Sequence, residues 1–278
     1  MAIKSLINGS SIDVPSAQDR GLQYGDGLFE TIAIENDFLL CWEEHIERLQ
    51  LGCSRLKIPM PSEEKLIEEA QSLVNNIERG VIKIIVTRGQ GGRGYALPLN
   101  VKTTRLISLY PWPEYSFGNP GNGIKVRLCS YRYGHNSTLA GIKHLNRLEQ
   151  VMARSEWTDT TIAEGIVLDN EENVIEGTMS NIFYIKDNTL HTPELSACGI
   201  NGIIRQKVIA LAAELSLEVR IDKISLQRLM DADEAFMCNS IIGIWPIILL
   251  GEKFLEVGGK TTRIKKLLQK YNFISELS

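Results

Sequence analysis

The chain has 278 residues, of which 44% are hydrophobic and 23% are charged. These values are near the averages for soluble globular proteins, so they argue against a disordered chain, a collagen-like repeat and a coiled coil. Its 30 Lys and Arg residues against 34 Asp and Glu residues give a net charge of -4, which provides no positive field to attract nucleic acid or an anionic membrane. We therefore expect a compact protein whose partner is a small molecule.

Three patterns bear on cellular location. The five cysteines are scattered and show no CxxC or CxxH spacing, so neither a disulfide framework nor a zinc site is predicted. The first residues alternate polar and apolar side chains, unlike the continuous apolar stretch of a signal peptide. The longest apolar run, 241–250, is interrupted by Gly243 and Pro246 and is shorter than the ~20 residues that span a bilayer. A cytoplasmic protein without a metal is expected.

The first part of the chain predicts hairpins and amphipathic helices. Residues 3–8 and 28–40 are expected as strands, because apolar residues alternate with small or polar ones and turn signals lie between them. The three- and four-residue spacing of Ile46, Leu49 and Cys53 predicts a helix over 43–57. The other elements expected in this part are a helix over 63–79 and strands over 81–88 and 104–110.

Residues 111–123 are rich in Pro, Gly and Asn and are predicted to link a domain over 1–110 to a domain over 124–278. In the second domain we expect strands over 124–131, 163–169, 173–176, 181–185, 217–221, 234–239 and 246–250, and helices over 145–157, 202–216, 225–231 and from 261 onward. Helices and strands that interleave at uneven spacing favour two α+β domains over a doubly wound sheet.

A glycine-rich segment from Gly89 to Gly94 matches the G-x-G-x-x-G pattern of dinucleotide-binding proteins. That pattern requires a following helix, whereas Pro98 and the strand signal over 104–110 come next. A hairpin loop is therefore predicted. Arg88 and Arg93, with Tyr95, make this loop a candidate carboxylate clamp, and the alternative is a flexible exposed loop.

Two residues suggest chemistry on an aldehyde cofactor. Lys143 lies among apolar neighbours, and burial would lower its pKa towards that of a nucleophilic neutral amine. The alternative is a lysine that extends from a strand end to solvent. Glu176 precedes a turn between two predicted strands, where a carboxylate could pair with a protonated pyridine nitrogen. A solvated hairpin glutamate is the alternative.

Three further segments suggest a phosphate site. The segment from Ile200 enters a periodic helix, whose first backbone N–H groups can bind a phosphate. Arg48 lies beside the apolar stripe of its helix and could extend inward to a phosphate or outward to water. Asn239 and Ser240 follow a strand and could add hydrogen bonds. An amine, a carboxylate and an anion cradle together indicate pyridoxal 5'-phosphate.

At these residues the chain resembles the fold-type IV pyridoxal-phosphate enzymes, which include aminotransferases and aminodeoxychorismate lyases. The motifs that carry this resemblance are GDGLFET at 25–31, HIERL at 45–49, TRGQGGRGY at 87–95, LAGIKHLNRLEQV at 139–151, EGTMSNIF at 176–183 and NGIIRQ at 201–206. GGRGY and AGIKHLNRLEQ are more similar to the lyases than to the aminotransferases.

The resemblance implies an α+β fold of two domains, with a smaller N-terminal α/β sandwich domain and a larger C-terminal domain built on a β-barrel-like sheet with flanking helices. It also implies a reaction. Aldimine formation, proton abstraction and β-elimination would convert 4-amino-4-deoxychorismate to 4-aminobenzoate and pyruvate. A D-amino acid or branched-chain aminotransferase of the same fold is the alternative, and a protein that binds the cofactor without catalysis is a third.

The resemblance assigns roles to individual residues. Lys143 is implied as the Schiff-base lysine and the acid and base, Glu176 as the partner of the pyridine nitrogen, and Arg48 as a phosphate ligand. The remaining phosphate contacts are assigned to the backbone of Ile203 and Ile204 and to Asn239 and Ser240.

Substrate contacts are implied at Arg93, Tyr95 and Thr31. The chain departs from the aminotransferase pattern at CNSIIGIWPI, over 238–247, where a Thr-rich segment with a glutamate is expected, which puts aminotransferase activity in doubt. The resemblance also implies a homodimer.

Overall fold

The computed structural model describes residues 2–11, 14–115 and 120–275. Contacts divide the chain into two compact units: unit 1 comprises Met1–Pro113 and Ile142–Asn146, and unit 2 comprises Glu114–Gly141 and Arg147–Ser278. This division falls inside the expected linker, of which residues 116–119 lie outside the described residues. The segment 142–146, which the sequence assigns to the second domain, joins unit 1 instead.

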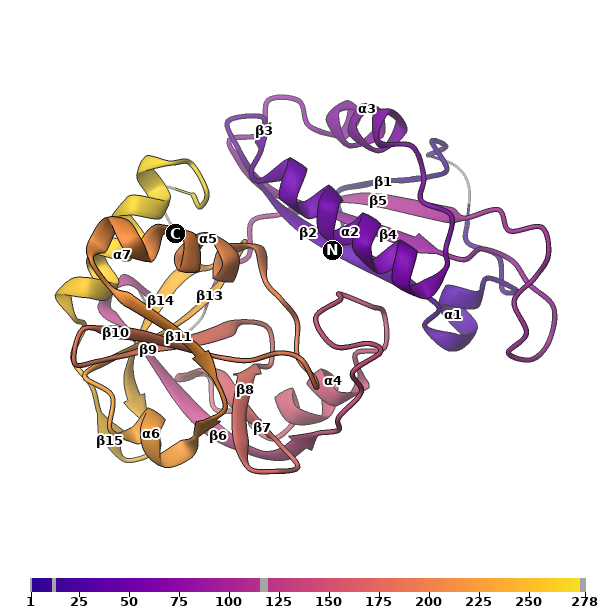
Figure 1. Cartoon of the computed structure of the whole chain (residues 1–278). Helices are drawn as coiled ribbons and strands as arrows, with labels where there is room; N and C mark the ends of the chain where they lie inside the picture. The colour runs from indigo at the N-terminus through magenta and orange to yellow at the C-terminus, as the bar shows by residue number, and fades with distance from the viewer. Residues whose placement is uncertain (1, 12–13, 116–119, 276–278) are drawn as a thin grey trace. The chain divides into compact units, whose positions relative to one another are not determined.

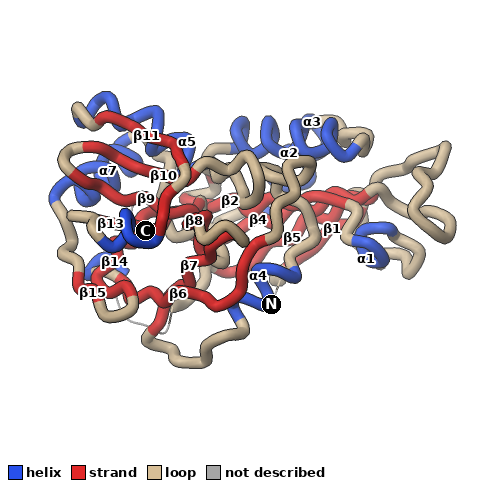
Figure 2. Tube along the Cα trace, turned by 60° about the horizontal axis from the view of Figure 1, so that its bottom comes forward, coloured by secondary structure: helices blue, strands red, loops and turns tan. Residues whose placement is uncertain are grey.

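Unit 1 is built on a five-stranded antiparallel sheet with the order β1-β5-β4-β2-β3. Its elements are β1 (Lys4–Ile7), α1 (Arg20–Tyr24), β2 (Gly27–Glu35), β3 (Phe38–Leu39), α2 (Trp42–Leu56), α3 (Glu63–Leu73), β4 (Arg79–Thr87) and β5 (Thr104–Pro111). Helices α2 and α3 lie along one face of this sheet (Figure 2). The glycine-rich segment joins antiparallel β4 and β5, so the prediction of a hairpin loop is confirmed.

Strand β2 shows how the sequence alternation divides the faces of this sheet. Leu28, Ile32 and Ile34 are buried and point to the same side as Glu30, which bonds to side chains of α2. The intervening Phe29 is only half-buried and faces the other side. The helix-covered face therefore forms the core of unit 1.

Helix α3 ends at Leu73, short of the expected Arg79. The C-cap residue Val74 has an extended backbone, and Asn76 adopts a left-handed conformation with φ 56°. The amide of Ile77 then donates to the Asp37 carboxylate at 2.7 Å. Because these residues leave the helical conformation, Arg79 begins β4 instead.

Unit 2 is built on a ten-stranded mixed sheet with the order β11-β10-β9-β13-β14-β6-β7-β8-β12, to which β15 adds through β14. Its strands are β6 (Ile124–Tyr133), β7 (Ile162–Asp169), β8 (Asn173–Gly177), β9 (Asn181–Lys186), β10 (Thr189–Pro193), β11 (Glu218–Asp222), β12 (Ile224–Ser225), β13 (Glu234–Asn239), β14 (Gly243–Leu250) and β15 (Lys253–Phe254). Its helices are α4 (Leu148–Arg154), α5 (Ile203–Leu211), α6 (Leu226–Met230) and α7 (Gly259–Lys270), with 3-10 turns η1 (Pro120–Asn122) and η2 (Ala212–Leu215).

This large sheet curls into a nearly closed barrel, as Figure 1 shows. One core cluster includes Ile166, Met237 and Trp245. A second one, with Phe183 and Phe236 stacked at 5.1 Å, packs the sheet against α5 and α7. The expected α+β fold, with a small N-terminal unit, a larger barrel-like sheet and flanking helices, is confirmed.

Helix α4 and strand β14 also begin at residues other than those expected. Helix α4 begins at Leu148, whereas 145 was expected, because residues 142–146 pair with unit 1 and leave the helical path. Strand β14 begins at Gly243 and includes Pro246, which lies opposite Phe236. Among the described residues, no helix is long and apolar enough to cross a membrane.

Candidate active site

Lys143 lies in the short irregular segment that joins unit 1. Its carbonyl accepts a hydrogen bond from the Phe29 amide at 3.0 Å, and the Leu145 amide donates to the Gly27 carbonyl at 2.9 Å. These bonds fasten the segment to β2 on both sides of the lysine. The Lys143 ammonium lies 4.4 Å from the centroid of the half-buried Phe29 ring. The half-buried side chain thus lies against an aromatic ring, and its role as the Schiff-base lysine stays a prediction.

The same face of the sheet carries a second amine. Thr31 follows Phe29 at the two-residue period of a strand, so both side chains point to one face. Lys83 pairs with Thr31 across β4 and β2, and its ammonium lies 5.3 Å from the Phe29 ring centroid. Two amines and a hydroxyl therefore share this face. Lys83 was not predicted, although a lone lysine within the apolar run VIKIIV is a signal that could have identified it.

The opposite face holds Arg48 in a buried ionic cluster. Its Nε donates to Glu30 Oε1 at 2.8 Å, its Nη2 also reaches this carboxylate, and His45 Nδ1 lies 2.6 Å from Oε2. Burial alone would raise the pKa of Glu30, but Arg48 and His45 outweigh burial and lower it to about 2. Burial also lowers the pKa of His45, which favours the neutral ring. Arg48 is therefore buried and oriented by an ion pair with Glu30, and its contact with a phosphate stays a prediction.

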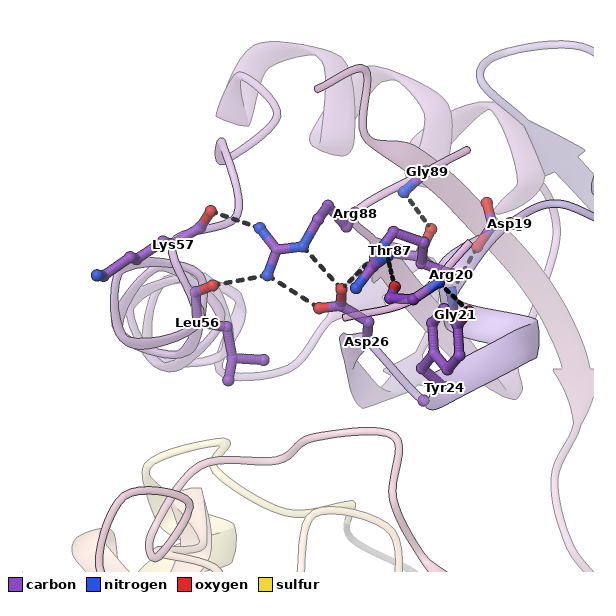
Figure 3. A network of polar contacts seen from close by, with 12 residues as sticks. Asp19, Arg20, Gly21, Tyr24, Asp26, Leu56, Lys57, Thr87, Arg88 and Gly89 are labelled. Atoms are coloured by element: carbon purple, nitrogen blue, oxygen red, sulfur yellow. Dashed lines mark hydrogen bonds and ion pairs between the residues drawn. The ribbon is translucent and has the colours of Figure 1, made fainter. Parts of the chain in front are cut away.

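Arg88 belongs to a separate polar network in unit 1 (Figure 3). Its Nε and Nη2 donate to the Asp26 carboxylate at 2.7 and 2.9 Å, and its other bonds go to the carbonyls of Leu56 and Lys57. Arg20 donates to the same carboxylate at 2.9 Å. Burial raises the pKa of Asp26, but the two arginines outweigh it and lower this pKa. The Arg88 guanidinium is buried and bonds to Asp26 and to two backbone carbonyls. The prediction that Arg88 belongs to a clamp for a substrate carboxylate is therefore wrong.

Arg93 and Tyr95 lie on the exposed hairpin loop between β4 and β5. Contacts with α1 fasten this loop: Arg20 Nη1 donates to the Gly94 carbonyl at 3.0 Å, the Gly94 amide donates to the Tyr24 hydroxyl at 3.3 Å, and the rings of Tyr24 and Tyr95 meet edge to face at 5.6 Å. The loop is thus attached to α1 at Gly94 and Tyr95, although Tyr95 remains 85% exposed. Contact of Arg93 and Tyr95 with a substrate stays a prediction.

Glu176 lies at the end of β8 in unit 2 and is buried, unlike a solvated hairpin residue. Its Oε2 accepts hydrogen bonds from the Ile200 amide at 2.9 Å and from Asn181 Nδ2 at 3.3 Å. Burial lowers the pKa of Arg147, and the nearby Glu176 opposes this effect. Burial and the Glu176 carboxylate raise the pKa of Tyr133. The carboxylate thus lies in a polar cluster that can hold it in one orientation.

The predicted phosphate segments of unit 2 are a helix N-terminus and a tight turn. Helix α5 begins at Ile203 after the N-cap Gly202, which has no side chain to cap the first N–H groups. In the turn, Asn239 Oδ1 accepts from the amides of Ile241 and Ile242, each at 2.8 Å. The Asn239 side chain therefore shapes the turn that carries Ser240.

Glu164 was not predicted by sequence reasoning. It is 1% exposed, and its carboxylate accepts five hydrogen bonds, all from residues 165–180. Two of these come from the side chains of Thr178 and Ser180. Met179, in the same loop, accepts a hydrogen bond from Asn239 Nδ2 at 2.9 Å. Glu164 thus fixes the loop after Glu176 and, through it, the turn at Asn239.

These features coincide with a known protein family. Residues 27–250 match the amino-transferase class IV family, and the chain belongs to it. Members of this family are pyridoxal-phosphate enzymes, which confirms the resemblance inferred from the motifs and the class of cofactor.

Within the family, the chain is similar to proteins with different activities. It is 37% identical over 230 residues to an aminodeoxychorismate lyase of Vibrio harveyi, covering 82% of this chain and 84% of that protein. The crystal structure of a 4-amino-4-deoxychorismate lyase from Pseudomonas aeruginosa matches with a TM-score of 0.91 and 40% identity, covering 96% and 98% of the two chains. A D-alanine aminotransferase of Listeria monocytogenes is 30% identical, covering 99% of this chain and 96% of that protein.

Proposed function

We propose that the protein is a pyridoxal-phosphate-dependent lyase that converts 4-amino-4-deoxychorismate to 4-aminobenzoate and pyruvate. The observation that carries this proposal is its 37% and 40% identity to two aminodeoxychorismate lyases, against 30% to the D-alanine aminotransferase. The lyase-like segments Gly91–Tyr95 and Ala140–Gln150 add support, since the second contains the lysine held against Phe29.

The described residues fit the cofactor. The N-cap Gly202, whose added Cβ would lie 2.1 Å from Asn181 Oδ1, makes no side-chain cap at the start of α5, so the first N–H groups of this helix can donate to a phosphate. The residues proposed to hold the cofactor are Lys143, Glu176, Arg48, Ile203, Ile204, Asn239 and Ser240. When bound, pyridoxal phosphate supplies an electrophilic aldehyde carbon and a ring that accepts electrons.

The side chains of the protein then divide the work of the reaction. The Lys143 amine removes the proton from substrate C4 and returns a proton to the departing enolpyruvate carbon. Glu176 holds a proton at the ring nitrogen of the cofactor. Arg93, with Tyr95 and Thr31, is proposed to bind the substrate carboxylates, and Lys83 adds a positive charge on the face of Thr31.

The test is a product assay with the purified protein and its substrate, with and without 2-oxoglutarate. We expect pyruvate and 4-aminobenzoate in equal amounts without the keto acid. Lys143→Ala should abolish turnover and the visible absorption of the bound cofactor, whereas Lys65→Ala, at an exposed position on α3, should change neither. Turnover that requires 2-oxoglutarate would identify an aminotransferase, and cofactor binding without turnover would identify a binding protein.

We also propose that the protein acts as a homodimer in the cytoplasm. Leu148, Val151 and Met152 are 77%, 57% and 54% exposed and form one apolar stripe at helical spacing on α4. A second copy of the chain would cover this stripe. We expect the wild type to sediment as a dimer and Val151→Glu to sediment as a monomer. A wild-type monomer would contradict the proposal.

A further inference from the structure

Asn181, the first residue of β9, lies between the two groups that are proposed to bind opposite ends of the cofactor. It is buried, and its Nδ2 donates to Glu176 Oε2 at 3.3 Å and to the Ile200 carbonyl at 2.8 Å. The Ile200 amide donates to the same carboxylate oxygen at 2.9 Å. One amide group therefore closes a ring of hydrogen bonds with the carboxylate and the backbone.

The other end of the Asn181 amide faces the start of α5. Its Oδ1 would lie 2.1 Å from a Cβ at Gly202, the N-cap of this helix. The backbone between these contacts is also fixed, because the Gly141 amide donates to the Gly199 carbonyl at 2.8 Å and the Asn201 amide donates to the Gly141 carbonyl at 3.1 Å. Asn181 thus contacts the segment 199–202. This segment bonds to Glu176 through the Ile200 amide and leads into α5 at Gly202.

We propose that Asn181 is a positioning residue that sets the spacing between the Glu176 carboxylate and the N-terminus of α5. This inference rests on the proposed cofactor site, in which the carboxylate binds the ring nitrogen and the helix N-terminus binds the phosphate. A ligand held at both ends gains affinity only while the two groups keep the separation that it requires. The Asn181 side chain supplies that constraint through its contacts with the Glu176 carboxylate, the Ile200 carbonyl and Gly202.

The test compares the affinities of pyridoxal phosphate and pyridoxal, which lacks the phosphate, for the purified apoprotein. In Asn181→Ala we expect the Kd of pyridoxal phosphate to rise about tenfold, because the carboxylate and the helix N-terminus no longer keep the separation that a ligand bound at both ends requires. The Kd of pyridoxal should rise much less, because pyridoxal has no phosphate to bind at the helix. The Kd of pyridoxal divided by the Kd of pyridoxal phosphate therefore falls. In Asn181→Asp this quotient should fall further, because the new carboxylate lies against the N-cap residue and repels the phosphate of pyridoxal phosphate.

A purely structural role predicts other results. Asn173→Ala, which removes an amide that bonds to Asp169 in the same unit, should leave this quotient unchanged even if it lowers the melting temperature. An equal rise of both Kd values in Asn181→Ala and Asn181→Asp, or no rise, would overturn the inference. If the wild type binds neither compound, the proposed cofactor site itself is refuted. If the wild type binds both compounds, the two variants test the role of Asn181 alone.

Discussion

The buried Glu30 cluster gives a prediction that can be calculated from the structure. Folding lowers the pKa of Glu30 from 4.5 to about 2, and at ~1.4 kcal/mol per pH unit this corresponds to about 3 kcal/mol of folding free energy. Because the pKa falls on folding, this stabilisation is complete above pH 4.5 and is lost as the pH falls towards 2. Glu30→Gln removes it and leaves Arg48 and His45 without this carboxylate.

We expect Glu30→Gln to destabilise unit 1 by about 3 kcal/mol at pH 7, which corresponds to roughly 100-fold faster hydrogen exchange by the opening of α2. Exchange of α2 and β2 peptides, followed by mass spectrometry, measures this effect. Glu47→Gln, on the exposed side of α2, is the matched control and should exchange like the wild type.

The pH dependence tests the cause of this effect. Thermal melting at pH 7 and pH 3 should show the difference between wild type and Glu30→Gln falling by about half, because at pH 3 only ~1 pH unit separates the solution from the folded pKa. A difference of equal size at both pH values would refute the assigned role of the ionised carboxylate. Equal exchange in Glu30→Gln and Glu47→Gln would refute the role of the cluster.

Three other substitutions test contacts described above. Glu164→Gln replaces an acceptor of five hydrogen bonds with a group that must also donate, and should lower stability by about 2 kcal/mol in chemical denaturation; an unchanged midpoint would contradict this role. Gly202→Ala places a Cβ 2.1 Å from a buried amide oxygen and should lower the melting temperature, whereas Gly259→Ala, with no atom within 4 Å of the added Cβ, should not. Arg88→Met should destabilise the protein by about 3 kcal/mol, measured by urea denaturation, and a loss below 1 kcal/mol would show that this ion pair contributes little.

Local sequence patterns determined much of the architecture. Strand β2 and helix α2 could be predicted because their signals are local. These signals are the two-residue alternation in β2 and the helical spacing of Ile46, Leu49 and Cys53 in α2. The glycine-rich loop was assigned to a hairpin for the same reason, since a strand signal and not a helix follows it. Element ends were less predictable, as at α3, where a distant carboxylate, Asp37, captures the amide of Ile77.

The residues proposed to react in the candidate site could be chosen from the sequence because their motifs are contiguous. The groups that orient them are far apart in the chain: Glu30 binds Arg48 from another element, and Asn181 and Ile200 meet at Glu176 from different parts of unit 2. Such pairings depend on sheet order and burial, which no local pattern encodes. The sequence alone thus indicated which side chains are proposed to carry the chemistry. Only the tertiary structure showed which buried partners hold them, because these partners are distant in the chain and meet only in the folded protein.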